Sequence, residues 1–496
     1  MTILWKIYWI KNRILTAFLL LLLAVPAFAA AVPVADFSGS PTIGELPLSV
    51  SFTDTSSGNP GGYAWFFGDE TFAGTWTRQT AAAGWTKRLR PAVVATPDGT
   101  IVLMGGHDDS TNRNDVWQSD DKGVSWTLVN ASPGWIGRHA HAAVILPEGS
   151  IIMTGGFNSN SKREVWMSAD KGATWSVLTV NPGFTARYYH TMNVLPDGSI
   201  VIIGGYGDSD GRMNDVWRSA DGGLTWTQMT AAAAWSKRDS HASVALPDGS
   251  LVLMGGFDGD YLNDVWRSED KGVSWTLINA SPGWAARRIS SAVVMPDGSI
   301  VLTGGYDDAS RMSDVWRSTD RGETWILASG NPGWPTRDGH AMVVLPDASI
   351  VLMGGYDNVG SSLSELVKND TWRFQPAGWS LEGNPKHTYT NEGSYNVALQ
   401  VYNADGYDST RKAGYINAGT TGGVIPLPGY TNSPTDPDKD GIYEDLNANG
   451  RQDFNDITLY FTYLEWIAEN EPIAAFDLNG NGRIEFADMV VLFNEI

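Results

Sequence analysis

The chain has no cysteine and few basic residues, and each scarcity excludes a class of chemistry. With no cysteine among its 496 residues, it has no disulfide, thiolate metal site or cysteine nucleophile. It contains 34 Lys and Arg residues but 55 Asp and Glu residues, which gives a net charge of −21. This negative charge argues against nucleic-acid or anionic-membrane partners and favours cation binding. Only 18% of residues are charged, whereas 55 are Gly and 22 are Trp, so we expect a β-rich chain of two to four domains rather than disorder.

Long apolar runs are confined to the N-terminal end. Lys6, Lys11 and Arg13 accompany an apolar run over 14–25, which the segment Pro-Ala-Phe-Ala follows. This pattern predicts a signal peptide over 1–30, cleaved near Ala29 or Ala30, with an uncleaved anchor as the alternative. Because no later run approaches the ~20 apolar residues that span a bilayer, we expect a secreted, cell-surface-associated protein with no membrane span once the signal is removed.

A motif of about fifty residues occurs six times along the chain. Gly-Gly pairs begin at 105, 155, 204, 255, 304 and 354, and a Trp follows each pair, with a second Trp about nine residues later in five units. The first unit predicts four short strands, over 92–95, 101–104, 115–118 and 126–129, which is the size of a propeller blade. Trp76 lies 50 residues before Trp126. We therefore predict that the segment around Trp76 supplies the outer strand of the sixth blade and removes the ring's open edges.

Two features of this motif carry a family resemblance. The Gly-Gly pair with its following Trp resembles Kelch repeats, and Ser119-Asp-Asp-Lys-Gly-Val-Ser-Trp126 resembles an Asp box of the BNR type, with further boxes from Ser168, Ser219, Ser268 and Ser318. The resemblance implies a six-bladed β-propeller over 72–376. It also implies that the Asp boxes are structural turns between the outer strands.

The segments on either side of the repeat complete one another. Trp65-Phe-Phe-Gly-Asp69 lies before it, and His387-Thr-Tyr389 and the alternating segment 393–402 lie after it. Together they resemble a PKD domain, an immunoglobulin-like β-sandwich, divided into 31–71 and 377–418 by the propeller. Glu70 departs from the family motif, which has Gly there. The resemblance implies an extracellular spacer or adhesion module; two separate flanking fragments are the alternative.

The C-terminal residues 436–496 hold 14 acids and three bases, after a linker predicted over 419–435. Two segments have the spacing of a 12-residue calcium loop, in which carboxylate and amide oxygens alternate around a sharp glycine turn. The predicted ligands, with backbone carbonyls at the two Arg positions, are Asp445, Asn447, Asn449, Arg451, Asp453, Asp456, Asp477, Asn479, Asn481, Arg483, Glu485 and Asp488. A helix is expected after each loop. A further cation site near Asp436–Asp440 is a weaker expectation.

Two loop–helix units ending in Asp resemble a dockerin. The resemblance implies a small α-helical domain that binds Ca²⁺ and docks to a cohesin-like protein. Phe454-Asn455 and Phe486-Ala487 stand where cellulosomal dockerins have Ser-Thr pairs, so their partner specificity does not transfer. The combination of domains resembles exported surface proteins of methanogenic archaea.

The propeller offers candidate binding residues in loops expected to share one face. Aromatic side chains that stack on sugar rings stand three residues before Arg; the candidates are Trp85, Arg88, Trp135, Arg138, Trp235, Arg238, Trp284, Arg287, Trp334 and Arg337. Packing between identical blades is the alternative for these pairs. His141, His190, His241 and His340 follow three residues after an Arg and are expected to be packed and hydrogen-bonded near the channel.

We expect a non-catalytic protein- or glycan-binding protein and assign no catalytic residue. A sialidase needs a Tyr–Glu pair outside the repeat pattern, and no such pair is apparent. The absence of cysteine excludes a Kelch-type copper oxidase with a Cys-linked Tyr. A glycoside hydrolase, which would need two carboxylates ~5–10 Å apart, and a purely structural surface-layer scaffold remain alternatives.

Overall fold

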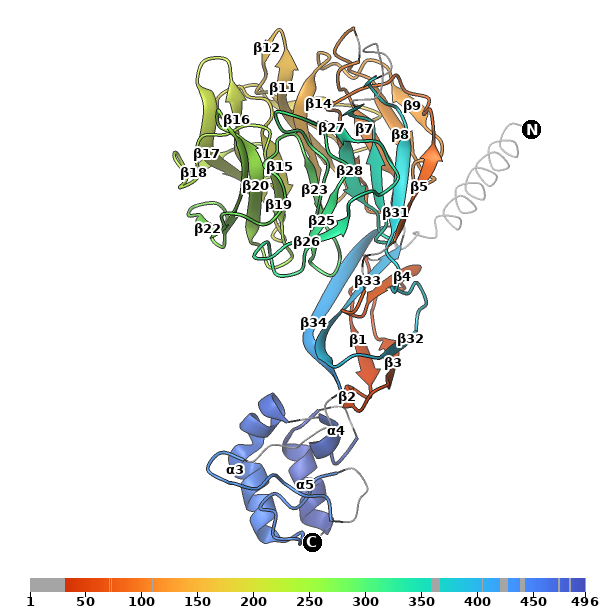
Figure 1. The fold of residues 1–496 in the computed structure, drawn as a ribbon, viewed down its shortest axis with the longest axis vertical. Coiled ribbons are helices and arrows are strands. Elements are labelled where there is room, and N and C mark those ends of the chain that lie inside the picture. Colours follow the sequence, from red (N-terminus) through yellow and green to blue (C-terminus); the bar gives the residue numbers. More distant parts are fainter. Residues whose placement is uncertain are drawn as a thin grey trace, which may run out of the picture.

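The computed structural model describes residues 32–70, 72, 74–108, 110–357, 366–403, 405–419, 427–437, 442–471, 473–480 and 483–495. The predicted signal peptide therefore lies outside the described residues, as does most of the predicted third cation loop. Three parts follow one another along the longest axis: a large ring of small sheets, a two-sheet body and a helical C-terminal part (Figure 1).

The repeat folds into small antiparallel sheets, six of them among the described residues and each made mainly from consecutive strands. Sheet 1 contains β6 (Ala92–Ala95), β7 (Ile101–Met104), β8 (Val116–Ser119) and β9 (Thr127–Asn130). Sheet 2 contains β10 (His139–Ile145), β11 (Ile151–Asn158), β12 (Asn160–Ser161), β13 (Val165–Ser168) and β14 (Ser176–Thr179). Sheet 3 contains β15 (Thr191–Val194), β16 (Ile200–Gly207), β17 (Gly211–Ser219) and β18 (Thr227–Thr230). Sheet 4 contains β19 (Ala242–Ala245), β20 (Leu251–Phe257), β21 (Tyr261–Ser268) and β22 (Thr276–Asn279). Sheet 5 contains β23 (Ser291–Val294), β24 (Ile300–Thr303), β25 (Val315–Ser318) and β26 (Ile326–Ser329). Sheet 6 contains β28 (Ala341–Val344), β29 (Ile350–Met353), β31 (Thr371–Gln375) and β5 (Thr75–Thr80). A short pair, β27 (Arg337–Asp338) and β30 (Tyr356–Asp357), adjoins sheet 6.

The strands predicted for the first unit agree with β6 and β7, and the other two are shifted by one residue. Asp115, placed in the third strand by the pattern, precedes β8 because its carboxylate accepts hydrogen bonds from the Arg88 guanidinium and the Trp117 indole. The Asp box forms the next turn: the Ser119 hydroxyl accepts the Gly123 N–H at 2.9 Å, and Asp121 accepts the Ser125 N–H at 2.8 Å. The predicted structural role of the box is confirmed.

The six sheets form a closed ring. The first strands of neighbouring sheets contact one another in a complete cycle, including β28 with β6. Closure of sheet 6 depends on β5, which comes from before the repeat and pairs antiparallel with β31, with Trp76 opposite Phe374. The predicted closing strand is therefore confirmed, and the arrangement is consistent with a β-propeller.

A second closure runs through the backbone around the ring axis. Near the start of each first strand lies a residue with a positive φ, whose N–H donates to the carbonyl of the equivalent residue in the preceding unit at 2.7–3.2 Å. The six residues are Arg90, Ala140, Tyr189, Ser240, Ile289 and Gly339. A left-handed conformation is costly for a β-branched residue. Ile289 adopts it at φ 57°, so the closed set of hydrogen bonds must hold it there.

The two-sheet body combines chain from both sides of the repeat. One sheet contains β1 (Phe37–Ser40), β3 (Leu48–Asp54) and β32 (Lys386–Tyr389); the other contains β2 (Ile43–Gly44), β34 (Gly406–Ala418), β33 (Gly393–Asn403) and β4 (Gly62–Phe66). Phe37 and Val50 from the first sheet pack with Trp65 and Leu399 from the second in one buried core. The predicted pairing of the segments before and after the repeat is present.

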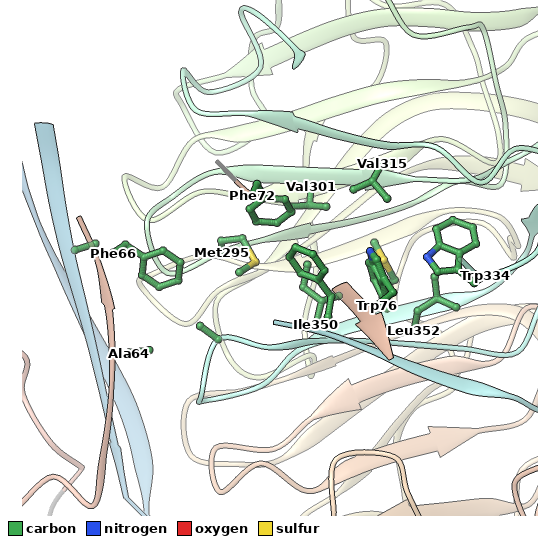
Figure 2. Packing of buried hydrophobic residues seen from close by; sticks show 14 residues of the cluster. Ala64, Phe66, Phe72, Trp76, Met295, Val301, Val315, Trp334, Ile350 and Leu352 are labelled. Atoms are coloured by element: carbon green, nitrogen blue, oxygen red, sulfur yellow. The ribbon is translucent and has the colours of Figure 1, made fainter. Parts of the chain in front are cut away.

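The body is packed directly against the ring. Ala64 and Phe66 of β4 belong to the same hydrophobic cluster as Met295 and Ile350 of the ring (Figure 2). Because one core crosses the junction, the two parts are joined by buried apolar area as well as by the chain.

Glu70, which departs from the family motif, lies at this junction. Its buried carboxylate accepts the N–H groups of Phe67 and Gly68, and Arg317 of the ring donates to its carbonyl at 3.2 Å. Burial raises the pKa of Glu70 to about 7. Arg317 also pairs with Asp297 and lies 4.9 Å from the ring centroid of Phe72. Position 70 therefore contacts the ring through its backbone carbonyl, whereas the Glu70 side chain bonds within its own loop.

The C-terminal part contains α3 (Phe454–Asn470), α4 (Ile473–Phe476) and α5 (Phe486–Glu495). Asp453 caps α3 in a reciprocal capping box with Asp456, which fixes where the helix begins. Leu446, Tyr460 and Leu492 are buried in a small core of their own. A helix was expected after each predicted loop, and α3 and α5 confirm this. In the part of the chain that the structure describes, no helix has the length and apolar content needed to cross a membrane.

Replacing Trp76 by Ala tests the closing strand. Trp76 is 5% exposed in the cluster that joins sheet 6, sheet 5 and the body. Since Trp→Ala in a core costs about 3–5 kcal/mol, we expect the ring to unfold at lower denaturant concentration in Trp76→Ala. Thr77→Ala, at the exposed neighbouring position of β5, is the control. Equal midpoints for both variants in equilibrium denaturation would contradict the assigned role.

Candidate functional site

The Trp–Arg pairs predicted to bind a ligand lie inside the ring. All ten side chains are at most 2% exposed: Trp85, Arg88, Trp135, Arg138, Trp235, Arg238, Trp284, Arg287, Trp334 and Arg337. Each Trp fills the core between two neighbouring sheets; Trp135, for example, packs with Met104 of sheet 1 and Met153 of sheet 2. This burial argues against the ligand-contacting role predicted for these residues and favours the alternative, packing between units.

Each of these arginines completes the same internal network. Arg88 donates to the carbonyl of Gly105 at 2.9 Å and to both carboxylate oxygens of Asp115, and its guanidinium lies 5.7 Å from the Trp85 ring centroid. Asp115 also accepts the Trp117 indole N–H at 2.8 Å. The network recurs around the ring, with Glu164 in place of Asp in sheet 2. A buried guanidinium needs such a partner because desolvation of an unpaired charge is costly.

The predicted histidines lie along the ring axis. They are buried as expected, but their hydrogen bonding differs from the prediction. Among the described residues, neither ring nitrogen of His141 or His190 has a hydrogen-bond partner. His241 and His340 each have one contact, between Nε2 and a Thr hydroxyl, at 3.1 and 2.9 Å. Burial, with a smaller effect from the nearby arginines, lowers the pKa of His190, His241 and His340 to about 3.

These histidines line a cavity of about 170 Å³ on the axis, together with the residues of the backbone hydrogen-bond ring. Pro91 and Ser290 occupy the two positions where the repeat has no His. The cavity therefore breaks the sixfold pattern at two of its six units. Arg90 is the charged residue among the described residues that line it.

The face of the ring beyond this cavity carries aromatic and charged side chains that the sequence analysis did not single out. The residue directly after each Gly-Gly pair forms a ring of half-buried side chains: His107, Phe157, Tyr206, Phe257, Tyr306 and Tyr356. We call this set, with the arginines that stack on it, the aromatic rim. Its spacing is visible in the sequence, because the six positions follow the six pairs.

Three arginines stack on the aromatic rim. The Arg212 guanidinium lies 4.5 Å from the Phe257 ring centroid and pairs with Asp239 at 2.9 Å. Arg311 lies 4.2 Å from the Tyr356 centroid and pairs with Asp338. Arg288 lies 4.7 Å from Phe257, and its Nε has no hydrogen-bond partner among the described residues. Stacked arginines and aromatics are typical anchors of protein interfaces.

The opposite end of the axis is covered by the two-sheet body. A cavity of about 580 Å³ is lined there by the turns between first and second strands and by Tyr407 and Asp408 at the start of β34. Gln400 of β33 donates to the Pro346 carbonyl at 2.6 Å. The aromatic rim therefore lies on the ring face away from the body; the β11–β12 turn, which follows Phe157 of the rim, is at the end of the ring far from the body in Figure 1.

The predicted calcium ligands that the structure describes lie in the loops before α3 and α5 and at the start of these helices. Asp445 accepts the N–H groups of Asn449 and Gly450 at 2.9 and 2.7 Å, and Asp456 accepts that of Asn447 at 3.1 Å. In the second loop, Asp488 accepts the N–H groups of Asn479 and Glu485 at 3.0 and 2.7 Å.

The two loops thus treat the carboxylate at position 12 in the same way: Asp456 accepts the N–H groups of Asn447 and Asp453, as Asp488 accepts those of Asn479 and Glu485. Arg451, Asp453, Asp477 and Arg483 lie in these loops as well, whereas Asn481 falls outside the described residues. Among the residues that the structure describes, no three Asp, Glu or His side chains are already gathered closely enough to hold a metal ion.

Comparison with known families identifies part of the ring. Residues 90–297 match the family model of the KLHDC2/KLHL20/DRC7 Kelch-repeats domain. This segment is therefore similar to a Kelch-repeat domain. The match spans the strands from β6 to β23 and includes the Gly-Gly pairs of sheets 1–4. A comparison with curated proteins found no match.

The buried histidines of the ring should make the protein sensitive to acid. Their pKa is near 3 when folded and near 6.5 when unfolded, so the unfolded chain binds more protons between these values. The contribution of these buried, neutral histidines to the free energy of unfolding is therefore fully present above pH 6.5, and it is lost as the pH drops toward 3. His190→Gln removes one of these groups. The slope of the free energy of unfolding against pH should therefore decrease by the equivalent of about one proton, roughly 1.4 kcal/mol per pH unit. Urea unfolding at several pH values measures this, and an unchanged slope would contradict it.

Proposed function

We propose that the protein is an exported, non-catalytic binding protein. A six-bladed Kelch-repeat propeller presents the aromatic rim to a protein partner, and a dockerin-like tail binds calcium and docks to a cohesin-like protein. The observation that carries the proposal is the aromatic rim on the ring face that the body leaves open. The PKD-like, immunoglobulin-like sandwich between them acts as a spacer.

The rim suits a protein partner for physical reasons. Half-buried aromatic rings and stacked guanidiniums combine large contact area with hydrogen-bonding capacity, which is the composition of interface hot spots. Arg288 is the rim arginine for which we propose the partner's carboxylate or carbonyl as the missing acceptor. The match to the Kelch-repeat family model also supports a protein partner, since Kelch-repeat propellers are generally interaction domains.

Binding of the labelled protein to cells of its source organism tests the rim. We expect saturable binding that protease treatment of the cells removes, and Arg288→Ala to weaken it by about tenfold or more, as loss of a hot spot does. Arg163→Ala, an exposed arginine on the same face, is the control. Sensitivity to glycosidases would reassign the rim to a glycan, and equal binding by both variants would remove it as the binding surface.

The loops before α3 and α5 suit calcium because their donors are hard oxygen atoms in the 12-residue spacing. Asp445, Asp477, Asp456 and Asp488 would supply carboxylates, Asn447, Asn449 and Asn479 amide oxygens, and Arg451 and Arg483 backbone carbonyls. Burial, together with the neighbouring Asp453 and Asp445 carboxylates, raises the pKa of Asp456. Crowded carboxylates of this kind favour a bound cation.

The helices that follow the loops expose matched apolar side chains suited to docking. Phe454 and Phe461 of α3 are 65% and 62% exposed, and Phe486 and Phe493 of α5, at the same positions of the second unit, are 56% and 57% exposed. Four exposed phenylalanines on so small a domain are typical of an interaction surface. They support the proposed cohesin-like partner.

Calcium titration tests the tail. We expect two ions to bind and the unfolding midpoint of the helical part to rise, since ligand at a hundred times its Kd stabilises by about 2.7 kcal/mol. Asp456→Ala with Asp488→Ala should abolish both effects, whereas Glu465→Ala, an exposed acid on α3, should not. Calorimetry showing no saturable heat, or an unchanged midpoint after chelation, would refute the proposal.

A further inference from the structure

The axial cavity is lined by polar side chains, several of which have buried atoms without hydrogen-bond partners among the described residues. It is walled by four histidines, Arg90, Tyr189, Ser240, Ser290 and apolar or backbone groups, with no carboxylate among its described lining residues. His141 and His190 are 6% and 5% exposed, and all four of their ring nitrogens lack partners among the described residues. Buried polar atoms of this kind normally have a partner, from the protein or from a bound species.

Arg90 adds a positive charge to the cavity wall. Its guanidinium lies 4.9 Å from the Tyr189 ring centroid, and its Nε is buried without a hydrogen-bond partner among the described residues. It therefore differs from the arginines of the internal network, such as Arg88, each of which has a carboxylate partner. An unpaired cation in a partly enclosed site favours an anion.

Nearby acids do not cancel this charge. Asp239 and Asp338 lie close enough to influence Tyr189, but Asp239 is paired with Arg212 and Asp338 with Arg311. Asp239 also accepts the Ser240 hydroxyl at 2.7 Å. Both carboxylates thus pair with arginines other than Arg90, and the cavity wall keeps the Arg90 charge and the unpartnered nitrogens of His141 and His190.

We propose that the axial cavity binds a small oxyanion, such as a carboxylate or phosphate, between the Arg90 guanidinium and the ring N–H groups of His141 and His190. A neutral imidazole has one N–H donor, so these histidines serve without becoming charged. A volume of about 170 Å³ admits an anion of a few heavy atoms and excludes a peptide. The site is independent of the partner proposed for the aromatic rim.

The seven histidines of the chain allow a direct test in the full-length protein. Labelled histidine ring signals are followed by NMR while sodium acetate or sodium phosphate is added at constant pH, with sodium chloride holding the ionic strength constant. We expect saturable shifts for His141 and His190. His387, which lies in the two-sheet body beside Asp69 at 2.8 Å, should not respond.

Arg90→Gln should weaken this binding by about tenfold or more, because hydrogen bonds to a charged group are lost. Arg163→Gln, an exposed arginine away from the cavity lining, is the matched control and should bind as the natural chain does. No saturable shift, an equal response at His387, or the same affinity in Arg90→Gln and Arg163→Gln would overturn the proposal. If Arg90→Gln does not fold, the shifts in the natural chain decide alone.

Discussion

The structure depends on closure of the ring. Six small sheets each pack a face against the next, and the last is completed only when β5 pairs with β31. The same requirement appears at the axis, where six backbone N–H groups donate around a full circle. An unclosed ring would expose strand edges and the tryptophans between sheets. The open face, the axial cavity and the position of the body all follow from this constraint.

Repetition and function occupy different residues in this ring. The Trp–Arg–Asp network recurs because every unit has the same packing problem to solve, and its members are buried. Residues that differ between units lie where the units converge. Arg90 lines the axial cavity, whose wall has Ser290 in place of a histidine, and Arg288 stacks on the rim without a carboxylate. Individual side chains thus give specificity to a symmetrical scaffold.

Much of the fold could be predicted from the sequence because its signals are local and repeated. The Gly-Gly spacing gave the number of units, and the Trp76 spacing gave the closing strand. The burial of Arg88 could not be predicted, because its partner Asp115 lies 27 residues away and only the folded unit brings them together. The unpartnered histidines depend on cavity shape, which residue type does not encode. The positions of the rim residues can be read from the sequence, because each follows a Gly-Gly pair. The sequence does not show, however, that these aromatic side chains gather on one face of the ring.

The insertion has a mechanical consequence. The chain enters the ring at Thr75 and leaves at Gln375, which face each other at one end of the β5–β31 ladder. A force that pulls these two residues apart would break the hydrogen-bonded pairs of that ladder one after another, starting from this end. Outside them, however, the Trp65 N–H donates to the Ser380 carbonyl at 2.8 Å, and both segments continue into the sheets of the body. Tension applied through the tail is therefore borne by the body, and the ring holds its shape under load.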